Sequence, residues 1–506
     1  MGCGVSSSST PEAAPAQSAP SWSDHKLPNH TTPVLLTGVD GGLQLLLLHP
    51  EAADPRVTVQ EKPHDAVRLV TRCSFTASLV SLGSDLPPSF SYTVDDVPYS
   101  GRWFGKGGQP GKVVAMSCNG FESGDARLEL GGIGERWGRL ADEEDVQMLL
   151  MGGDQVYADS VWHIDELRQR SELDDPDTLK KPLSDAIVAA VEDYYFELYL
   201  RMWTVPKVAA VVSRIAAVCI WDDHDVFDGW GSYPSGMQDS PVYHQIYAIA
   251  RRYFYIFQVP VAPQVELPQI ASRTLRAGDI GVIVLDTRSE RTRTQVLHPG
   301  DLASLGKRVG QLAQDGATHV LVAVSIPAVY VPVKLAERMY VAMPDYQNME
   351  DDLRDQWRSE GHQEERLRLF STLQQAAVDH GVRVSLVSGD VHLAAHGTVT
   401  CESLGPGATL NQLTSSPMGN HTPPGMLVTG LNMAGDFDED LELAGGAKGV
   451  ARLVKVGDSG KRFLAQRNFL VLDTNADGAL VARWELERRD DDDVETATTI
   501  VDPFAK

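Results

Sequence analysis

Short apolar runs separated by turn residues dominate the first part of this chain. After residue 30, runs such as Val34–Leu36 and Leu43–Leu48 alternate with Gly, Pro and Asp. Runs of this length with such boundaries are typical of β-strands. The pattern predicts a small β-sandwich-like, all-β domain over residues 31–108. Residues 1–30 are rich in Ser, Ala and Pro without periodicity, and we expect a disordered tail there.

From residue 109 onward, strand-like runs alternate with longer helical stretches. Apolar side chains recur every three or four residues over Ala186–Trp203 and Gln363–Val378, which predicts two amphipathic helices. This alternation is typical of α/β (α+β) architecture. We expect the main domain to span residues 109–430. Residues 431–506 are expected to add C-terminal strands that complete the fold and an acidic tail at Asp490–Asp493.

Composition and charge exclude several classes of protein. The 506 residues are 42% hydrophobic and 22% charged, which is ordinary for a globular chain. A net charge of −25 repels polyanions and disfavours long nucleic acid as a partner. No apolar run reaches the ~18 residues of a membrane span. The five cysteines form no Cys-x-x-Cys pair, so a reducing compartment such as the cytoplasm is expected.

The first six residues, MGCGVS, match a lipidation pattern. Gly2 is placed for N-myristoylation and Cys3 for palmitoylation, so a eukaryotic protein of this sequence would contact a membrane face. The alternative interpretation is an accidental match in a disordered start. No apolar stretch precedes Cys3, and the pattern therefore predicts neither a secretory signal nor a bacterial lipoprotein signal.

Five of the predicted strands each end at a polar or reactive cluster. The clusters are Ser117–Asn119, Asp154–Asp159, Asp222–Asp225, Asp286–Arg288 and Ser388–His392. Because ligands bind at the carboxyl ends of strands in α/β sheets, the clusters are expected to converge on one site. The three anions in Asp222–Asp225 would repel one another after a buried strand. A divalent or trivalent metal is the simplest way to hold them together.

These clusters offer oxygen, nitrogen and thiolate ligands together. The inventory is Cys118, Asp154, Tyr157, Asp222, Asp223, His224, Asp225, Asp390 and His392. Carboxylates suit Ca, Mg or Mn, whereas thiolate and phenolate suit iron or zinc. Two metals roughly 3.5–4 Å apart would clamp a displacement at phosphorus. Arg288 would add a fixed cation for a phosphoryl group.

The order of these motifs resembles the PhoD-like alkaline phosphatase and phosphodiesterase family of the calcineurin-like metallophosphatase superfamily. The motifs are Ser117-Cys118, Gly153–Asp159, Asp222–Asp225, Leu285–Arg288 and Ser388–His392. The resemblance covers roughly residues 109–430. It implies a metallophosphatase four-layer sandwich, in which helices flank a central β-sandwich. It also implies at least two metal ions: iron together with calcium is the first expectation, and Mn, Mg or Zn are the alternatives. The implied reaction is the hydrolysis of small phosphoesters.

The resemblance also implies roles for individual residues. The implied metal ligands are Cys118, Asp154, Tyr157, Asp222, Asp223, Asp390 and His392. Among them, Asp154 resembles the carboxylate that bridges both metals, and Cys118 and Tyr157 resemble ligands of the iron-type metal. Asp223 stands where the superfamily usually has Asn in Gly-Asn-His.

The implied catalytic residues are His224, Arg288 and Asp286. His224 resembles the general acid that protonates the leaving alkoxide, and Arg288 resembles the phosphate clamp, oriented by Asp286. Residues 227–229 depart from the family pattern, because calcium-binding members often carry Asn there. The sequence therefore leaves open which metal occupies the second position. Gly419-Asn420-His421 imitates a superfamily motif in the wrong order and is interpreted as a substrate-side loop at best.

The sequence thus predicts a metal-dependent phosphoesterase that uses metal-activated hydroxide, with phosphate monoesters favoured. One alternative is a phosphodiesterase that acts on lipid-derived or nucleotide diesters, which an acyl anchor would favour. The other is a membrane-associated, metal-containing binding protein. The complete set of Asp154, His224, Arg288 and His392 argues against a binding protein, because a site kept only as structure needs neither an acid nor a phosphate clamp.

Overall fold

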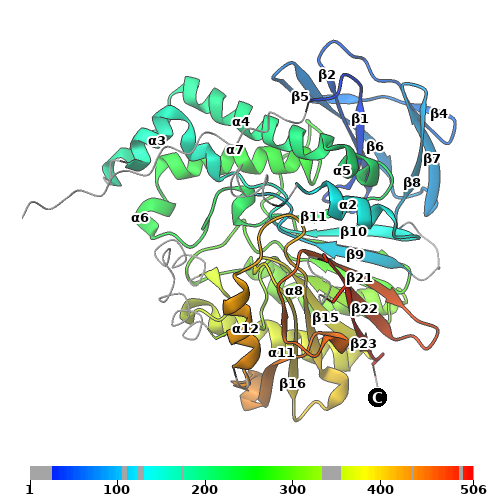
Figure 1. Cartoon of the computed structure of the whole chain (residues 1–506), viewed down its shortest axis with the longest axis vertical. Coiled ribbons are helices and arrows are strands. Elements are labelled where there is room, and N and C mark those ends of the chain that lie inside the picture. Colours follow the sequence, from blue (N-terminus) through cyan, green and yellow to red (C-terminus); the bar gives the residue numbers. More distant parts are fainter. Residues whose placement is uncertain are drawn as a thin grey trace, which may run out of the picture.

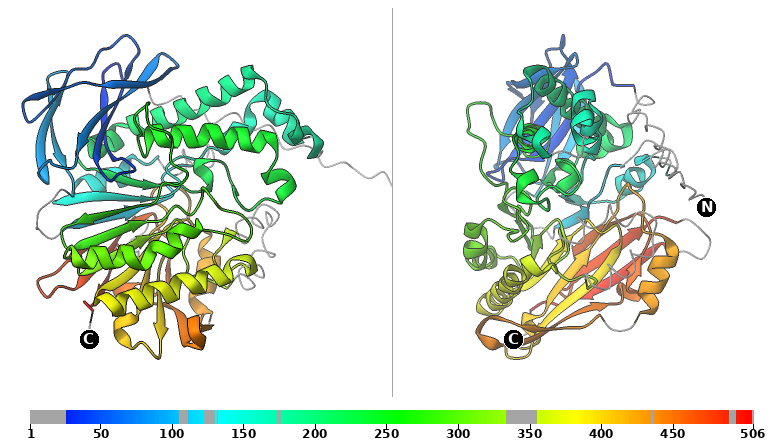
Figure 2. Two further views of the ribbon diagram at one scale, coloured as in Figure 1. Left: turned by 180° about the vertical axis from the view of Figure 1, so that it is seen from behind. Right: turned by 90° about the vertical axis from the view of Figure 1, so that its left-hand side faces the viewer.

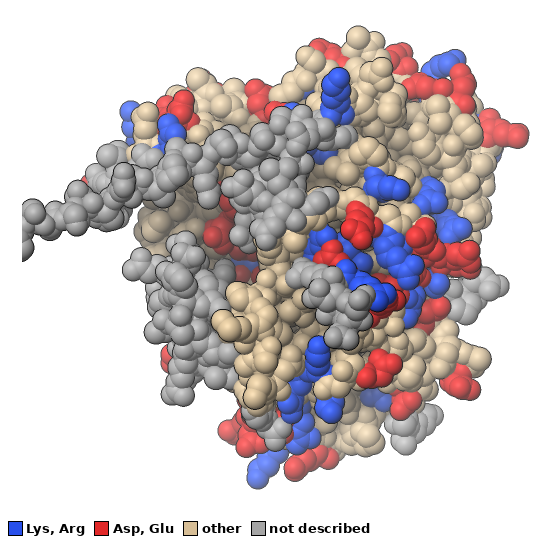
Figure 3. All heavy atoms as spheres, viewed as in Figure 1, with Lys and Arg blue, Asp and Glu red and all other residues tan. Residues whose placement is uncertain are grey.

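The computed structural model describes most of the chain (Figure 1). The described residues are 26–104, 111–121, 130, 132–172, 176–332, 355–434, 437–488 and 494–504. The lipidation pattern at Gly2 and Cys3 and the acidic tail at Asp490–Asp493 lie outside them. No helix within the described ranges combines the length and the apolarity needed to cross a membrane. On the face drawn in Figure 3, acidic and basic side chains are interspersed.

A ten-stranded mixed sheet forms one half of the core. Its order is β23-β22-β21-β9-β10-β11-β1-β2-β6-β5. The strands are β1 (Thr32–Thr37), β2 (Leu43–Pro50), β5 (Val67–Arg72), β6 (Phe75–Gly83), β9 (Lys112–Met116), β10 (Val146–Gly152), β11 (Ala217–Ile220), β21 (Asn468–Thr474), β22 (Leu480–Leu486) and β23 (Thr496–Val501). Strands β9, β10, β11 and β1 run parallel, so their carboxyl ends share one edge.

A second mixed sheet forms the other half. Its order is β12-β13-β14-β15-β17-β16-β19-β18, and β20 pairs with β16. The strands are β12 (Arg273–Ala277), β13 (Ile280–Val284), β14 (His319–Ala323), β15 (Arg383–Ser388), β16 (Ala394–Cys401), β17 (Leu410–Thr414), β18 (Glu439–Glu442), β19 (Lys448–Val454) and β20 (Phe463–Leu464). Strands β13, β14, β15 and β17 are parallel.

Alternation along the buried strands separates three apolar cores. Val113 on β9 and Val282 on β13 belong to the core between the sheets, whereas Val114 and Ile283 face outward into two further cores. Successive strand residues point to opposite faces, so each sheet also has an apolar outer face. Helices cover that outer face on each sheet. Figure 2 shows these helices on opposite sides of the paired sheets. The helices are α2 (Gly134–Ala141), α4 (Asp185–Thr204), α5 (Pro206–Val212) and α7 (Pro241–Phe257) on one side, and α8 (Pro299–Gln314) and α11 (Gln363–His380) on the other.

The described residues 26–104 contain strands only, but these strands do not form one separate unit. Leu36 of β1 pairs in parallel with Ala217 of β11, so β1, β2, β6 and β5 extend the large sheet. The other four strands form a small sheet: β3 (Val57–Val59), β4 (Lys62–His64), β7 (Ser89–Val94) and β8 (Val97–Arg102). The boundary expected near residue 108 therefore does not separate the sheets. Strand β1 is buried along its length and needs hydrogen-bond partners on both edges.

Candidate metal centre

The strand ends of both sheets meet at one place. The loops after β9 and β10 are hydrogen-bonded to each other, from Asn119 N to Asp154 O at 2.8 Å. The loop after β15 lies against the loop after β14 through a bond from Gly389 N to Ser325 O at 2.8 Å. The predicted convergence is present, but it joins strands from two sheets and not from one.

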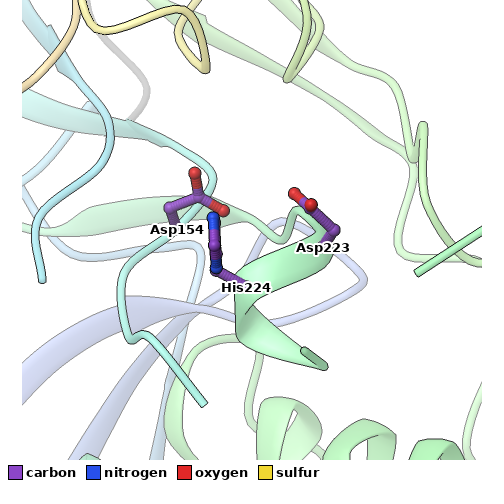
Figure 4. A group of neighbouring side chains, drawn as sticks. All are labelled: Asp154, Asp223 and His224. Atoms are coloured by element: carbon purple, nitrogen blue, oxygen red, sulfur yellow. The ribbon is translucent and has the colours of Figure 1, made fainter. Parts of the chain in front are cut away.

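Four carboxylates lie at the centre of this junction, and we call them the carboxylate cluster. Its members are Asp154, Asp222, Asp223 and Asp390, each of which has an oxygen within 4.8 Å of an oxygen of every other member. His224 forms a second close group with Asp154 and Asp223. Figure 4 shows these three side chains pointing toward one another. They come from the loop after β10 and from the short 3-10 turn η4 (Asp223–Asp225) after β11.

Three oxygens of the cluster are buried without a hydrogen-bond partner among the described residues. They are Asp154 Oδ1, Asp222 Oδ2 and Asp223 Oδ1. A buried carboxylate oxygen without a donor is costly, and several that face each other are more so. Oxygen ligands at this spacing are what a divalent cation requires. The residues present therefore fit a metal ion.

The same crowding changes the proton affinity of the carboxylates. Burial raises the pKa of Asp154 well above its usual range; His224 opposes this shift, and the charges of Asp222 and Asp223 add to it. Burial raises the pKa of Asp222 to about 6, although Arg288 lowers it in part. The raised pKa values mean that protons would compete with a bound cation for these carboxylates.

The backbone at the site is unusual at four predicted ligands. Cys118, Asp154, Asp390 and His392 have φ values of 52°, 53°, 69° and 51°. Non-glycine residues adopt this left-handed region only where the surrounding structure imposes it. Gly153, with φ at 112°, leaves no room for a side chain, because a Cβ there would lie 2.7 Å from Asp222 Cβ. The loops are thus folded tightly to bring these side chains together.

Asp225 fixes the backbone of the loops that carry the cluster. Its Oδ2 accepts hydrogen bonds from the backbone N–H groups of Asp154 and Asp222, both at 2.9 Å. Its Oδ1 accepts from Gln258 Nε2 at 2.7 Å and from Val156 N at 3.4 Å. Both oxygens are therefore used to fix the two ligand loops. The sequence alone did not distinguish this role from that of a ligand.

His224 is held from one side by a carboxylate that the sequence analysis gave no role. Its Nδ1 lies 3.0 Å from both oxygens of Asp159, and its ring stacks on Tyr157 with centroids 4.3 Å apart. Burial alone would lower the pKa of His224, but Asp159 and Asp223 raise it well above its usual value. Nε2 is left as the nitrogen available to the cluster.

The remaining predicted ligands border the cluster. Cys118 Sγ lies 3.4 Å from Asp154 Oδ2 and accepts a hydrogen bond from Ser416 Oγ at 3.0 Å. Burial raises the pKa of this thiol well above its usual value, and the charge of Asp154 adds to the effect. Tyr157 Oη lies 3.1 Å from His392 Nε2. A thiol, a phenol hydroxyl and an imidazole thus border the carboxylates.

The resemblance implies that Arg288 is a phosphate clamp, and the structure shows what its guanidinium contacts. Its side chain is fully buried. Nε and Nη2 donate to Asp222 Oδ1, Nη1 donates to Trp230 O and to Asp355 Oδ1, and Nη2 also donates to Asp355 Oδ2. These bonds use all five N–H donors of a guanidinium.

Asp286 is likewise buried, and its carboxylate does not orient the Arg288 guanidinium. It accepts hydrogen bonds from Trp221 Nε1 at 3.1 Å and from the backbone N–H groups of Arg288 and Ser289 at 3.1 and 2.9 Å. Its bonds therefore fix the backbone after β13. The guanidinium is oriented by Asp222 and by Asp355, a residue that no sequence motif singled out.

Two loops that departed from the expected motifs also contact the site. Gly229 N donates to Asp223 Oδ2 at 2.8 Å, so residues 227–229 support a cluster member through the backbone. Gly419 N donates to Cys118 O at 3.0 Å, and Asn420 is fully buried. The Gly-Asn-His segment therefore packs against the Cys118 loop.

The fold and the site define an α/β protein with a carboxylate-rich, metal-fitting centre between two sheets. Residues 103–349 and 345–437 match the family model described as PhoD-related phosphatase. Since the match covers more than half of the chain, the chain belongs to this family, and the resemblance noted in the sequence is confirmed.

Two individual proteins are also similar to this chain. An uncharacterized protein of Saccharomyces cerevisiae, YGR266W, is 25% identical over 359 residues, which are 57% of this chain and 50% of the relative. The chain thus spans about half the length of that relative. A solved structure titled "Structure of PhoD" has a TM-score of 0.55 at 13% identity and covers 96% of this chain and 90% of its own. This likeness shows the fold.

Proposed function

We propose that this protein is a metal-dependent phosphoesterase that hydrolyses phosphate monoesters at the junction of its two sheets. The observation that carries the proposal is the set of three buried oxygens in the carboxylate cluster that accept no hydrogen bond from the described residues. Membership of a phosphatase family supports the reaction type. A diesterase that acts on lipid-derived or nucleotide substrates is the second candidate.

The carboxylate cluster would hold the metals, with Cys118, Tyr157 and His392 on the side of an iron-type ion. Bound metal ions in such a site supply a Lewis acid and an activated water. Calcium, Mn or Mg would suit the carboxylates better than the sulfur ligand, whereas Zn, like iron, would suit the sulfur ligand. We therefore expect two different metal environments, iron with calcium being the first combination to test.

The chain itself supplies the proton transfer. His224 Nε2 is placed to protonate the leaving oxygen, because Nδ1 is held by Asp159 at 3.0 Å. Asp159 fixes the ring orientation and stabilises the charged ring, as a carboxylate does in other proton-transfer pairs. This pair favours an enzyme over a binding protein, since a purely structural metal cage has no use for an oriented acid.

Metal analysis combined with ester hydrolysis tests the proposal. The purified protein would be assayed with nitrophenyl phosphate and bis(nitrophenyl) phosphate, before and after chelation. Roughly two metals per chain and chelator-sensitive turnover would support the phosphoesterase, and the ratio of the two rates would rank monoesters against diesters. A protein that holds metal but cleaves neither ester would favour the binding protein. A protein without metal would contradict the proposal.

A further inference from the structure

Asp355 is a buried carboxylate that the proposed reaction leaves without a role. It lies 67 positions after Arg288 in the chain, yet the two side chains are in contact. Asp355 is 4% exposed, and Trp357 and His362 after it are fully buried. The segment that begins at Asp355 is therefore part of the core beside the metal centre.

Asp355 stands between two buried arginines. Its Oδ2 lies 2.8 Å from Arg288 Nη2, and its Oδ1 lies 2.5 Å from Arg291 Nε. Ser232 Oγ also donates to Oδ1, at 2.5 Å. Burial alone would raise the pKa of Asp355, but the two arginines lower it far below its usual value. The carboxylate is thus charged and balances guanidinium groups that have no access to water.

Arg288 connects Asp355 to the carboxylate cluster, because its guanidinium is hydrogen-bonded to both Asp355 and Asp222. Its Nε donates to Asp222 Oδ1 at 2.7 Å, and Nη2 donates to the same oxygen. The other oxygen, Asp222 Oδ2, is buried without a hydrogen-bond partner among the described residues. One oxygen of Asp222 is therefore held by Arg288, and the other is left to the cluster.

We propose that Asp355 is a positioning residue of the metal centre, which holds Arg288 so that Asp222 presents one free oxygen to a metal ion. The inference rests on the proposed function. Without the Asp355 charge, the two hydrogen bonds from Arg288 to this carboxylate would be weakened or lost, and Arg288 would be free to turn further toward the cluster. Asp222 would then lose its orientation, and the affinity for one metal would fall.

The next residue gives a second contact with the cluster. Gln356 Nε2 donates to Asp390 Oδ2 at 3.3 Å. Asp222 follows β11 of the ten-stranded sheet, and Asp390 follows β15 of the other sheet. Two consecutive residues, Asp355 and Gln356, thus support ligands from both sheets, one through Arg288 and one directly.

A metal titration of two matched variants tests the proposal. Asp355→Asn keeps the shape of the side chain and removes its charge. Glu439→Gln is the control, because Glu439 is also a mostly buried carboxylate between two arginines, Arg358 and Arg366, but outside the metal centre. Mn²⁺ would be titrated by calorimetry into metal-free, full-length protein. We expect Asp355→Asn to bind one Mn²⁺ at least about tenfold more weakly, and Glu439→Gln to bind as the wild type does.

Three results would overturn the proposal. In the first, Asp355→Asn keeps the wild-type affinity and stoichiometry. In the second, both variants weaken Mn²⁺ binding equally, which would indicate a general loss of stability. If Asp355→Asn does not fold, Ser232→Ala decides, because it removes one hydrogen bond to Asp355 and keeps the charge. A folded Ser232→Ala protein is expected to bind one Mn²⁺ a few-fold more weakly, and unchanged binding is the third contrary result.

The outcome separates this inference from the proposed function. A wild-type protein that binds no Mn²⁺ would overturn both. A wild type that binds two Mn²⁺ and hydrolyses esters, with Asp355→Asn unchanged in Mn²⁺ affinity, would remove only the role of Asp355.

Discussion

Two regions of this molecule hold carboxylates that are largely shielded from solvent, and the charges around them are opposite. Glu439, at the start of β18, is paired with Arg358 at 3.1 Å and with Arg366 at 2.8 Å. In the carboxylate cluster four carboxylates meet, and Arg288 is hydrogen-bonded to Asp222 and lies 3.6 Å from Asp223 Oδ1. The first region has more positive than negative side chains, whereas the second has a clear excess of negative ones.

The pKa directions follow from this difference. Burial would raise the pKa of Glu439, but the hydrogen bond and charge of Arg366, together with Arg358, lower it below its usual value. Burial raises the pKa of Asp390 well above its usual range, and the charges of Asp222 and Asp223 raise it further. A protein can balance a buried charge with its own side chains or with a bound ion. In the Glu439 region, the arginine side chains balance the charge. In the carboxylate cluster, a bound ion is needed to balance it.

Removal of one cluster carboxylate should have the largest effect. Asp154 belongs to both groups of side chains that could hold a metal ion. Asp154→Asn is therefore expected to lose metal and to lower kcat/KM at least about 1000-fold. The reason is that metals contribute several kcal/mol to transition-state stabilisation, and each ~1.4 kcal/mol is tenfold in rate. Metal analysis and ester hydrolysis would measure both effects.

Glu439→Gln is the control for this experiment. It removes a partly buried carboxylate from the region that balances its own charge. We expect normal metal content and normal kcat/KM. An Asp154→Asn protein with full metal content and activity would show that the cluster does not depend on a bound ion, and the comparison between the regions would fail.

The next effect concerns His224 and depends on the ester. His224→Ala removes the proposed acid, so hydrolysis of phenyl phosphate is expected to slow by about 100-fold or more. Nitrophenyl phosphate should be affected less, because its leaving group needs little protonation. The rates with both esters, and the metal content of the variant, would be measured.

Asp159→Asn provides the matched test. It keeps His224 but weakens the bond to Nδ1, and it should slow phenyl phosphate by a smaller factor than His224→Ala. Equal slowing of both esters, or loss of metal from His224→Ala, would contradict the acid role and indicate that His224 is a ligand.

The sequence was sufficient for local features of this site. The strand predicted before Ser117 is present as β9, which ends at Met116, and the cluster members all follow predicted strands. Such features depend on neighbours in the chain, whose pattern of apolar and polar residues is visible in the sequence. The chemistry of the ligands could therefore be predicted from residue types and order.

The sequence was not sufficient for contacts between distant segments. The pairing of β1 with β11 joins segments 180 residues apart, and neither run carries a signal for its partner. Asp355 follows no predicted strand, so its contact with Arg288 was invisible. Asp225 has the same side chain as Asp222, and only the tight turn between them directs Asp225 to backbone donors. These properties depend on tertiary geometry.

A smaller effect is expected on stability in the region that balances its own charge. Glu439→Gln should lower the free energy of unfolding by roughly 2 kcal/mol, because Arg358 and Arg366 lose a charged hydrogen-bond acceptor. Urea unfolding at neutral pH would measure the loss. Added metal should change the stability of this variant as much as that of the wild type, since the cluster is intact. A loss that metal restores would link the two regions and contradict their independence.

The smallest effect is the pH dependence of that loss. The pKa of Glu439 is lower in the folded protein than the usual value of about 4.3. Its contribution to stability is therefore fully present above the unfolded pKa and is lost as the pH falls through the folded pKa, because the unfolded chain then binds more protons. We expect the difference in unfolding free energy between wild type and Glu439→Gln to be constant from pH 7 to about 5 and to shrink below that. Other carboxylates titrate in both proteins and cancel in the difference. A difference that grows on acidification would mean that the pKa of Glu439 is raised in the folded protein, as the pKa values of Asp154 and Asp390 are. The contrast between the two regions would then be wrong.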